Sequence, residues 1–536
     1  MQKPWLVHYP PGIPATVNTN VFASMVELVD NAFNQFGERP ALTHGQTTLS
    51  YSELDALSRR FASWLQYQTS LQPGERLAVM LPNLPQYLVV LLGAWRAGLV
   101  VVNVNPQYTV RELTHQLVDA GAVAIVTLDT NLALVAQVQS AVMLRHTVIT
   151  TLGDWQSGAA DDAPLGDGVV SLARVLALGL EQPVLAVPLT QDDLALLQYT
   201  GGTTGLSKGA MLTHGNLVAN ILQAAPWYGD SLVPGQESVL TVLPIYHIFA
   251  LTFNCLLMLH FGAHNRLLSN PRDMAATMAA FQAGCSVVSG VNTLYNGLLN
   301  QPGFSDIDFS RLKFCACGGA AMQPAVAARW QQSTGVRLME GYGLSETSPF
   351  ALTNPITEPD GSRMLPMPST EIAIQDDAGH ELPYGTPGEV CIRGPQVMRG
   401  YWGRPEATAE VLSADGWFRS GDIGVMHPSG HVQITDRKKD LVLVSGFNVY
   451  PNEVEAMLAE HPGVVECAVV GIPDENTGEA LRAFVVSRDA TLAPDALIAH
   501  CRTGLTAYKV PKQVIFVPTL PKSPVGKILR RELRDS

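Results

Sequence analysis

Apolar runs and amphipathic patterns alternate along most of the chain. Ser50 and Glu53 have the spacing of a helix-capping box, and apolar residues follow at helical spacing from Leu54 to Leu65. A second helical pattern covers 111–120. Short runs rich in β-branched residues predict strands at 76–81, 99–103, 122–128, 239–243, 286–291 and 312–317. Strands that alternate with helices in this way predict parallel sheets, so the expected fold class is α/β.

The alternating pattern ends near residue 436 and restarts on a smaller scale. Strands are expected at 441–444, 464–470 and 482–486, with a helix at 452–461. We therefore predict a large body of several subdomains with mixed and parallel sheets, residues 1–436, and a small α+β domain, residues 437–536. The polar stretch 152–170 predicts a surface loop.

Charge is unevenly distributed between these two predicted domains. The 536-residue chain has a net charge of −13, which argues against binding nucleic acid by bulk electrostatics. Residues 437–536 nevertheless hold 13 basic and 12 acidic side chains, and 509–536 hold seven basic and two acidic ones. This basic tail suits a segment that meets a polyanionic small molecule, although a solvated helix end would have the same composition.

Cysteines and apolar stretches bear on the compartment. The chain has 7 cysteines, an odd number lying mostly in apolar runs, which favours reduced core thiols in an intracellular protein. Cys315 and Cys317 fit a strand better than a zinc site, because no second pair with zinc spacing follows them. The N-terminus has no signal-peptide pattern, and the apolar stretches 77–104 and 248–261 are interrupted or too short to span a bilayer. We expect a cytoplasmic protein, with peripheral contact to the inner face of the membrane left open.

The segment Tyr199–Gly209 (YTGGTTGLSKG) carries the clearest candidate chemistry. Its glycines let backbone N–H groups approach an anion, its threonines add hydroxyl donors, and Lys208 adds positive charge. It departs from the P-loop pattern, because no Gly-Lys-Ser/Thr follows its glycines at the required spacing. We interpret it as a different kind of phosphate loop, with a flexible turn as the alternative.

This segment is similar to the signature of the adenylate-forming superfamily, which includes acyl-CoA synthetases, luciferases and the adenylation domains of peptide synthetases. Further superfamily motifs follow in order at 244–249 (PIYHIF), 318–321 (GGAA), 341–347 (GYGLSET), 416–422 (GWFRSGD), 436–439 (DRKK) and 521–527 (PKSPVGK). Within the superfamily, 103–109 (NVNPQYT) and 441–451 (LVLVSGFNVYP) resemble bacterial long-chain fatty acyl-CoA synthetases. The resemblance covers essentially the whole chain. It departs from that subgroup at 360–366 (DGSRMLP), where the local loop and the acyl preference can differ.

The resemblance implies ATP, Mg²⁺ and CoA as cofactors and assigns roles to individual residues. The triphosphate would be held by Thr200, Gly201, Gly202, Thr203, Thr204 and Lys208. Glu346, together with Thr204, would bind Mg²⁺, as a hard carboxylate beside phosphate oxygens should. The adenine and ribose would lie against Gly318, Gly319, Ala320, Gly341, Tyr342, Gly343, Asp422 and Arg437. Among these, Asp422 would accept from the ribose hydroxyls, and turn or salt-bridge roles are the alternatives for Asp422 and Arg437.

The catalytic candidates under this resemblance are Lys527, His247, Thr204 and Glu346. Lys527 would bridge the substrate carboxylate and the α-phosphate as charge builds during adenylation. His247 would line the acyl pocket with Phe249 and Val291, and a buried core histidine is the alternative.

The resemblance also implies that the small domain is mobile and rotates about Lys439 between two half-reactions. After rotation, Ser445, Gly446 and Phe447 would face the active site and bind CoA. Gly446 would then leave room for pantetheine, although a purely backbone role is the alternative for this glycine.

The favoured function is ATP-dependent ligation of a medium- or long-chain fatty acid to CoA through an acyl-adenylate, with release of AMP and pyrophosphate. One alternative is a fatty acyl-AMP ligase that loads a carrier protein, but the insertion typical of those relatives is missing between Asp360 and Asp436. Another is a non-catalytic adenylate-binding sensor, which would have no need of Lys527. Fatty acid and CoA are the expected partners, nucleic acid is not, and a homodimer is left open.

Overall fold

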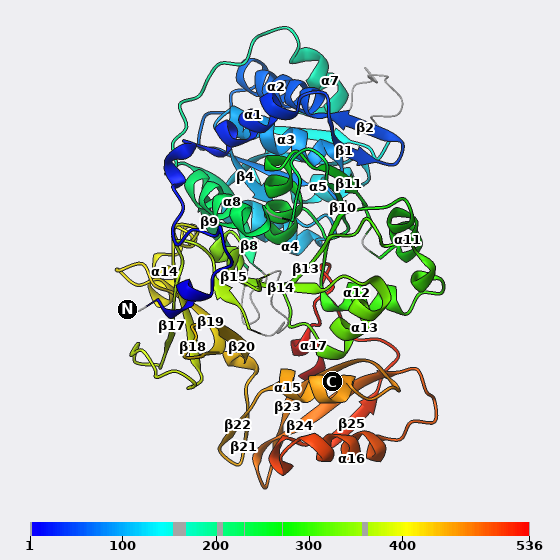
Figure 1. The fold of residues 1–536 in the computed structure, drawn as a ribbon. Helices are drawn as coiled ribbons and strands as arrows, with labels where there is room; N and C mark the ends of the chain where they lie inside the picture. The colour runs from blue at the N-terminus through cyan, green and yellow to red at the C-terminus, as the bar shows by residue number, and fades with distance from the viewer. Residues whose placement is uncertain are drawn as a thin grey trace.

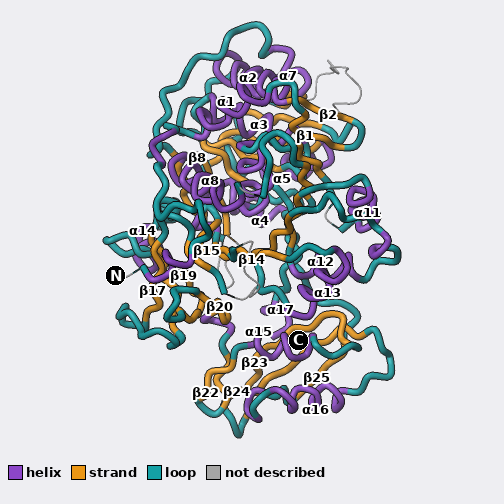
Figure 2. The backbone as a smooth tube through the Cα atoms, viewed as in Figure 1, coloured by secondary structure: helices purple, strands orange, loops and turns teal. Residues whose placement is uncertain are grey.

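The computed structural model describes residues 3–153, 168–200, 207–229, 231–270, 272–355 and 363–534. Figures 1 and 2 show a large upper body and a smaller C-terminal unit beneath it. The α-helices are α1 (Met25–Phe36), α2 (Tyr51–Gln68), α3 (Pro85–Arg96), α4 (Val110–Ala120), α5 (Leu132–Val138), α7 (Leu172–Leu178), α8 (His214–Tyr228), α9 (Ile248–Ala250), α10 (Met258–His260), α11 (Met274–Gln282), α12 (Asn292–Leu299), α13 (Pro324–Thr334), α14 (Pro405–Val411), α15 (Pro451–Ala459), α16 (Pro494–Gly504) and α17 (Arg530–Arg534).

A seven-stranded sheet forms one half of the body. Its order is β7 (Val169–Ser171), β6 (His146–Thr150), β5 (Ala122–Leu128), β3 (Arg76–Met80), β4 (Val100–Asn103), β8 (Leu194–Thr200) and β9 (Lys208–Thr213). Neighbouring strands are parallel except for the antiparallel pair β8 and β9. The two strands of that pair flank the predicted phosphate loop.

A nine-stranded sheet forms the other half. Its order is β16 (Leu365–Pro366), β15 (Phe350–Thr353), β14 (Leu338–Gly343), β13 (Phe314–Gly318), β12 (Val287–Gly290), β10 (Ser238–Thr241), β11 (His264–Leu267), β1 (Pro40–His44) and β2 (Thr47–Ser50). The strands from β14 to β1 are parallel. Their carboxyl ends therefore lie at one edge, which is where open α/β sheets bind ligands.

The two sheets of the body are joined by buried structure. All residues of α3 are buried, as expected for a helix that is apolar on every side. Just before α3, the Asn83 amide donates to the carbonyl oxygens of Thr241 (3.2 Å) and Leu243 (2.9 Å) and accepts from Ile245 N (2.8 Å). Asn83 thus ties the carboxyl end of β3 to the carboxyl end of β10.

An antiparallel sheet of β17 (Glu371–Gln375), β18 (Gly388–Arg393), β19 (Phe418–Met426) and β20 (Val432–Arg437) follows the nine-stranded sheet. The C-terminal unit comprises β21 (Val442–Val444), β22 (Phe447–Val449), β23 (Val464–Asp474), β24 (Gly478–Ser487), β25 (Gln513–Phe516) and helices α15 to α17. It has its own apolar cores, in which each fully buried large side chain contributes about 2 kcal/mol. The unit contacts the body at β20 and α13, and it accepts hydrogen bonds from Thr293 and Asn296 of α12 (Figure 1).

The structure confirms the predicted α/β class. The capping box at Ser50 begins α2, the strand expected at 122–128 is β5, and Cys315 and Cys317 lie in β13 as free, buried thiols. The predicted end of the loop at 152–170 is wrong, because β7 begins at Val169 and pairs with β6, and residues 154–167 of the predicted loop fall outside the described residues. In the described ranges no helix is long and apolar enough to cross a membrane.

Candidate active site

Most of the predicted site residues lie where the carboxyl ends of the body's strands face β19, β20 and the C-terminal tail. Thr200 is the last residue of β8, and Lys208 is the first of β9 and its paired partner across the hairpin. Gly201, Gly202, Thr203 and Thr204 fall outside the described residues. The hairpin thus ends with a hydroxyl and an ammonium group on either side of the predicted phosphate loop.

Glu346 lies in the 3₁₀ turn η6 (Ser345–Thr347) and is buried. The Tyr401 hydroxyl donates to Glu346 Oε1 at 2.8 Å, and the Lys208 ammonium lies 5.1 Å from the centre of the Tyr401 ring. Burial raises the pKa of the Glu346 carboxyl, although the hydrogen bond from Tyr401 acts against this rise. A buried carboxylate therefore stands close to the phosphate-loop lysine, an arrangement that suits an oxygen ligand for Mg²⁺ beside phosphate.

Glycines bring the ends of β13 and β14 close together. Gly318 pairs with Gly341 in parallel register, and a side chain at Gly343 would place its Cβ 1.7 Å from the Pro349 carbonyl oxygen. Gly343 can therefore only be glycine. Beyond β13, Gly319 is exposed with φ +77°, and Ala320 is half-buried. Small residues leave the strand ends open to a flat ligand such as a purine.

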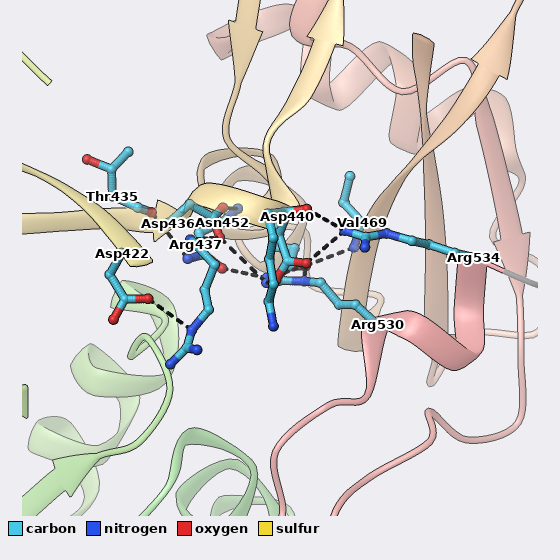
Figure 3. A network of polar contacts seen from close by, with 11 residues as sticks. Asp422, Thr435, Asp436, Arg437, Asp440, Asn452, Val469, Arg530 and Arg534 are labelled. Carbon is cyan, nitrogen blue, oxygen red and sulfur yellow. Dashed lines mark hydrogen bonds and ion pairs between the residues drawn. The ribbon is translucent and has the colours of Figure 1, made fainter. Parts of the chain in front are cut away.

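Asp422 is held by two partners from different strands. The Tyr342 hydroxyl donates to Asp422 Oδ2 at 2.8 Å, and Arg437 Nε lies 2.9 Å from Asp422 Oδ1 (Figure 3). Asp422 and Arg437 are paired residues on β19 and β20. Burial, followed by the Asp422 charge, raises the pKa of Tyr342 well above its usual value, so the phenol stays a donor. The carboxylate is thus fixed at the edge of the glycine-lined strand ends.

Lys527 reaches this group of residues from the C-terminal tail. Burial, and then the charge of Arg437, lower the Lys527 pKa to about 8, while Asp422 acts to raise it. Burial and the nearby Lys527 charge lower the pKa of His247 to about 4, so His247 is neutral near pH 7. The structure therefore brings together Lys527, His247, Asp422 and Arg437, which come from three distant parts of the chain.

Phe249 and Val291, predicted with His247 to line the acyl pocket, lie beside Gly318 and Gly526. Phe249 is buried against Phe253 and Phe350, and a Cβ at Gly318 would lie 3.4 Å from its ring. Phe253 belongs to a π-helical stretch, η4 (Leu251–Leu257), a local widening that is frequent at functional sites. Val291 caps α12, and its side chain lies 3.1 Å from where a Cβ at Gly526 would be. Apolar walls therefore begin next to the polar head of the site.

Comparison with known proteins identifies the family. The model of the AMP-binding enzyme family matches residues 29–402, and that of the AMP-binding enzyme C-terminal domain matches residues 453–527. The chain belongs to the AMP-binding enzyme family. The predicted superfamily is thereby confirmed.

Relatives of this AMP-binding enzyme match it over its full length. The long-chain-fatty-acid–CoA ligases of Salmonella typhimurium and Yersinia pestis are 47% and 46% identical, and each alignment covers 100% of this chain and 98% of the relative. Among solved structures, ATP-bound MatB from Rhodopseudomonas palustris superposes with a TM-score of 0.84 at 30% identity, covering 95% of this chain and 98% of that one.

In this AMP-binding enzyme the predicted hinge residue adjoins the site, where the charges of Arg437 and Asp422 act on the pKa of Lys439, whereas the predicted CoA residues lie on a separate hairpin. Lys439 lies in the 3₁₀ turn η7 (Lys438–Asp440), between β20 and β21. Phe447 is exposed at the β21–β22 hairpin and stacks on Tyr508, with ring centres 4.8 Å apart. Ser445 (φ +53°) and Gly446 (φ +81°) form the turn of this hairpin, at the outer side of the C-terminal unit (Figure 1). The backbone angle alone favours glycine at 446, because no atom lies within 4 Å of a Cβ built there.

Sequence reasoning missed Tyr401 as a site residue. Tyr401 forms an isolated bridge with Ala210 of β9, and Trp402 N donates to Gly209 O at 2.8 Å. These bonds hold the Tyr401 segment along the phosphate hairpin. The adjacent aromatic residues Tyr401 and Trp402 are visible in the sequence. The position of Tyr401 beside Lys208, however, depends on pairing between segments about 190 residues apart.

Proposed function

We propose that this enzyme joins a medium- or long-chain fatty acid to CoA, using ATP and forming an acyl-adenylate. The main support is that Lys527 lies beside the cluster of Tyr342, Asp422 and Arg437, next to apolar residues. The substrate class is carried over from the full-length relatives named long-chain-fatty-acid–CoA ligases. The products of the whole reaction are acyl-CoA, AMP and pyrophosphate.

In the first half-reaction, the fatty acid carboxylate attacks the α-phosphorus of ATP and pyrophosphate leaves. Lys527 donates to the carboxylate and the α-phosphate, and so stabilises the charge that builds there. Asp422 accepts from the ribose hydroxyls, with Arg437 on its other side. Neutral His247 orients the carboxylate at the mouth of the acyl pocket, which Phe249 and Val291 line.

The triphosphate lies along the β8–β9 hairpin. Thr200 and Lys208 contact its terminal phosphates together with the loop between them. Mg²⁺ would be held by Glu346 and Thr204, and it would neutralise phosphate charge when bound. The Tyr401 hydroxyl donates to Glu346 Oε1, and Glu346 Oε2 would be the oxygen left to bind the metal.

In the second half-reaction, the CoA thiol displaces AMP from the acyl-adenylate. We propose domains 1–436 and 437–536, with Lys439 as the hinge about which the smaller one turns. Ser445, Gly446 and Phe447 then face the site and contact pantetheine. ATP and CoA are intracellular metabolites, so the cytoplasm is the proposed location, whereas contact with the membrane and a homodimer stay predictions.

One assay tests the proposed function and its alternatives. AMP release is measured over saturated fatty acids of increasing length, with CoA, with a phosphopantetheinyl carrier protein, or with neither. We expect kcat/KM to be greatest for a medium or long chain with CoA. Comparable kcat/KM for acetate or benzoate would overturn the substrate class, and activity with the carrier protein alone would favour the acyl-AMP ligase.

We expect Glu346→Ala to raise the Mg²⁺ concentration needed for half-maximal adenylation, because a hard oxygen ligand is lost. The measurement is a metal titration of pyrophosphate release at fixed ATP. Tyr401→Phe is the matched control: it removes the hydrogen bond at 2.8 Å but keeps the carboxylate. Its titration should lie closer to wild type, and a normal titration for Glu346→Ala would remove Glu346 from the metal site.

We expect the kcat/KM of adenylation to fall as the pH rises above about 8. The Lys527 pKa lies near 8 in the free enzyme, and only the ammonium form stabilises the developing charge. Below that pH Lys527 is protonated, so its titration should not change kcat/KM. Lys527→Arg should remove the fall in kcat/KM, since a guanidinium stays charged over this pH range. Lys439→Gln is the control, because burial also lowers the pKa of Lys439 to about 8. This variant should retain the fall. A fall that persists in Lys527→Arg would assign it to another group.

A further inference from the structure

The junction between body and C-terminal unit contains a buried carboxylate, Asp436, at the end of β20. Its Oδ2 accepts from Asn452 N at 2.9 Å, and its Oδ1 lies 3.6 Å from Arg530 Nη1 (Figure 3). Burial raises the Asp436 pKa to about 6, even though the Arg530 charge acts to lower it. Apart from the hydrogen bond that Arg437 N donates to its Oδ1 (2.8 Å), Asp436 therefore depends on partners supplied by α15 and α17.

Those partners belong to a network that lies mostly beyond Lys439 in the sequence. Arg530 Nη2 lies 2.8 Å from Glu455 Oε2 and donates to Asn452 Oδ1 at 2.5 Å. Arg530 Nη1 also lies 3.5 Å from Asp440 Oδ2. Asn452, Glu455 and Arg530 form part of the C-terminal unit, and Asp440 precedes its first strand. Among these acidic partners, Asp436 alone precedes the proposed hinge.

Arg530 lies three residues after Lys527, so its position bears on the catalytic lysine. The loop that carries Lys527 is docked on the body at a second place: the Thr293 hydroxyl donates to Gly526 O at 2.9 Å. Ser523 Oγ accepts from Lys527 N at 3.1 Å and closes the loop. The network around Arg530 and this docking contact therefore fix both ends of the segment from Gly526 to Arg530.

We propose that Asp436 is a positioning residue that latches the C-terminal unit in the orientation that places Lys527 in the site. The proposal rests on the two-step function proposed above. Rotation about Lys439 separates Asp436 from Asn452 and Arg530, but it leaves Arg530 with Glu455 and Asp440. Asp436 thus stabilises the adenylation arrangement specifically, and in the thioester-forming one it keeps only the hydrogen bond from Arg437 N to its Oδ1. A latch of this kind sets the balance between the two half-reactions.

Asp436→Asn and Asp440→Asn make a matched pair of tests. Both lose one charge near Arg530, but only Asp436 and Arg530 lie on opposite sides of the hinge. For Asp436→Asn we expect adenylation to slow by about 10-fold, a usual size for coupling between two states. Thioester formation from pre-formed acyl-adenylate should be unchanged or faster. For Asp440→Asn the ratio of the two rates should stay near wild type.

A cross-link reports the orientation without substrate. A Cβ at position 526 would lie 2.8 Å from Thr293 Oγ1, close to the distance from Cβ to the far sulfur of a disulfide, about 3 Å. Thr293→Cys with Gly526→Cys should therefore cross-link in the docked orientation, with the same backbone strain at position 526 (φ +81°) in every background compared. The native cysteines are buried. We expect Asp436→Asn to slow this cross-linking several-fold and Asp440→Asn to leave it close to the parent rate.

Three results would overturn the proposed role of Asp436. The first is an equal loss of rate in both half-reactions of Asp436→Asn. The second is a change in the ratio of the two rates in Asp440→Asn as large as in Asp436→Asn, and the third is an equal cross-linking rate in Asp436→Asn and Asp440→Asn. Failure of the proposed function is distinct from these. If the proposed function is wrong, the wild-type enzyme forms no acyl-adenylate with any fatty acid. The cross-linking rates would still show whether Asp436 holds the C-terminal unit in the docked orientation.

Discussion

Replacement of Lys527 by Ala is expected to slow acyl-adenylate formation by about 10²- to 10³-fold, with ATP binding largely intact. The loss of one charge partner from a water-poor site costs about 3 kcal/mol in the transition state. Lys527 is the group that the structure places among Asp422, Arg437 and His247. Pyrophosphate release in a single turnover measures the step, and equilibrium binding of ATP measures the ground state.

Lys522→Ala provides the matched control for Lys527→Ala. Lys522 lies in the same loop, but its ammonium pairs with Glu466 of the C-terminal unit at 2.7 Å. We expect this variant to adenylate within a few-fold of the wild-type rate. Unchanged pyrophosphate release in Lys527→Ala would refute the role of Lys527, and an equal loss in both variants would point to damage of the loop instead.

Replacement of Lys439 by Pro is expected to reduce thioester formation by about 100-fold and to leave adenylation near normal. Lys439 lies in the first turn of η7, where a 3₁₀ φ near −60° matches proline and no helical N–H bond is needed. The substitution therefore fits the present orientation but prevents the φ change that a hinge needs. A 100-fold loss equals about 2.7 kcal/mol of barrier.

Pre-formed acyl-adenylate mixed with CoA measures the second step for Lys439→Pro directly. Lys439→Ala is the control, because it removes the same side chain and keeps the backbone free. We expect Lys439→Ala to form thioester at close to the wild-type rate. Wild-type thioester formation by Lys439→Pro would mean that the unit does not turn about this residue.

Sequence patterns located the elements of the fold well where local signals were strong. The capping box at Ser50 located the start of α2, and the apolar run at 122–128 located β5 with both of its boundaries. Motif resemblance likewise placed Tyr342, Asp422 and Arg437, which the structure brings into contact. These residues occur in motifs whose spacing is visible along the chain.

Contacts between distant segments could not be predicted in this way. Asp422 meets Arg437 because β19 and β20 pair in one register, and Tyr401 meets Glu346 because its segment lies along β9. Neither register is encoded in local periodicity, since a shift by one residue would turn each side chain to the other face. The buried partner of Asp436, Arg530, is 94 residues away and was visible only as one basic residue in a basic tail.

The amide of Asn83 has a consequence for inhibitors. Because this side chain joins the carboxyl ends of β3 and β10, it fixes the spacing between the sheet that carries the phosphate hairpin and the sheet that carries the glycine-lined strand ends. A non-hydrolysable analogue that links an acyl chain to adenosine would meet this spacing already formed. Such a bisubstrate compound should bind without the ordering cost that two independently mobile half-sites would impose.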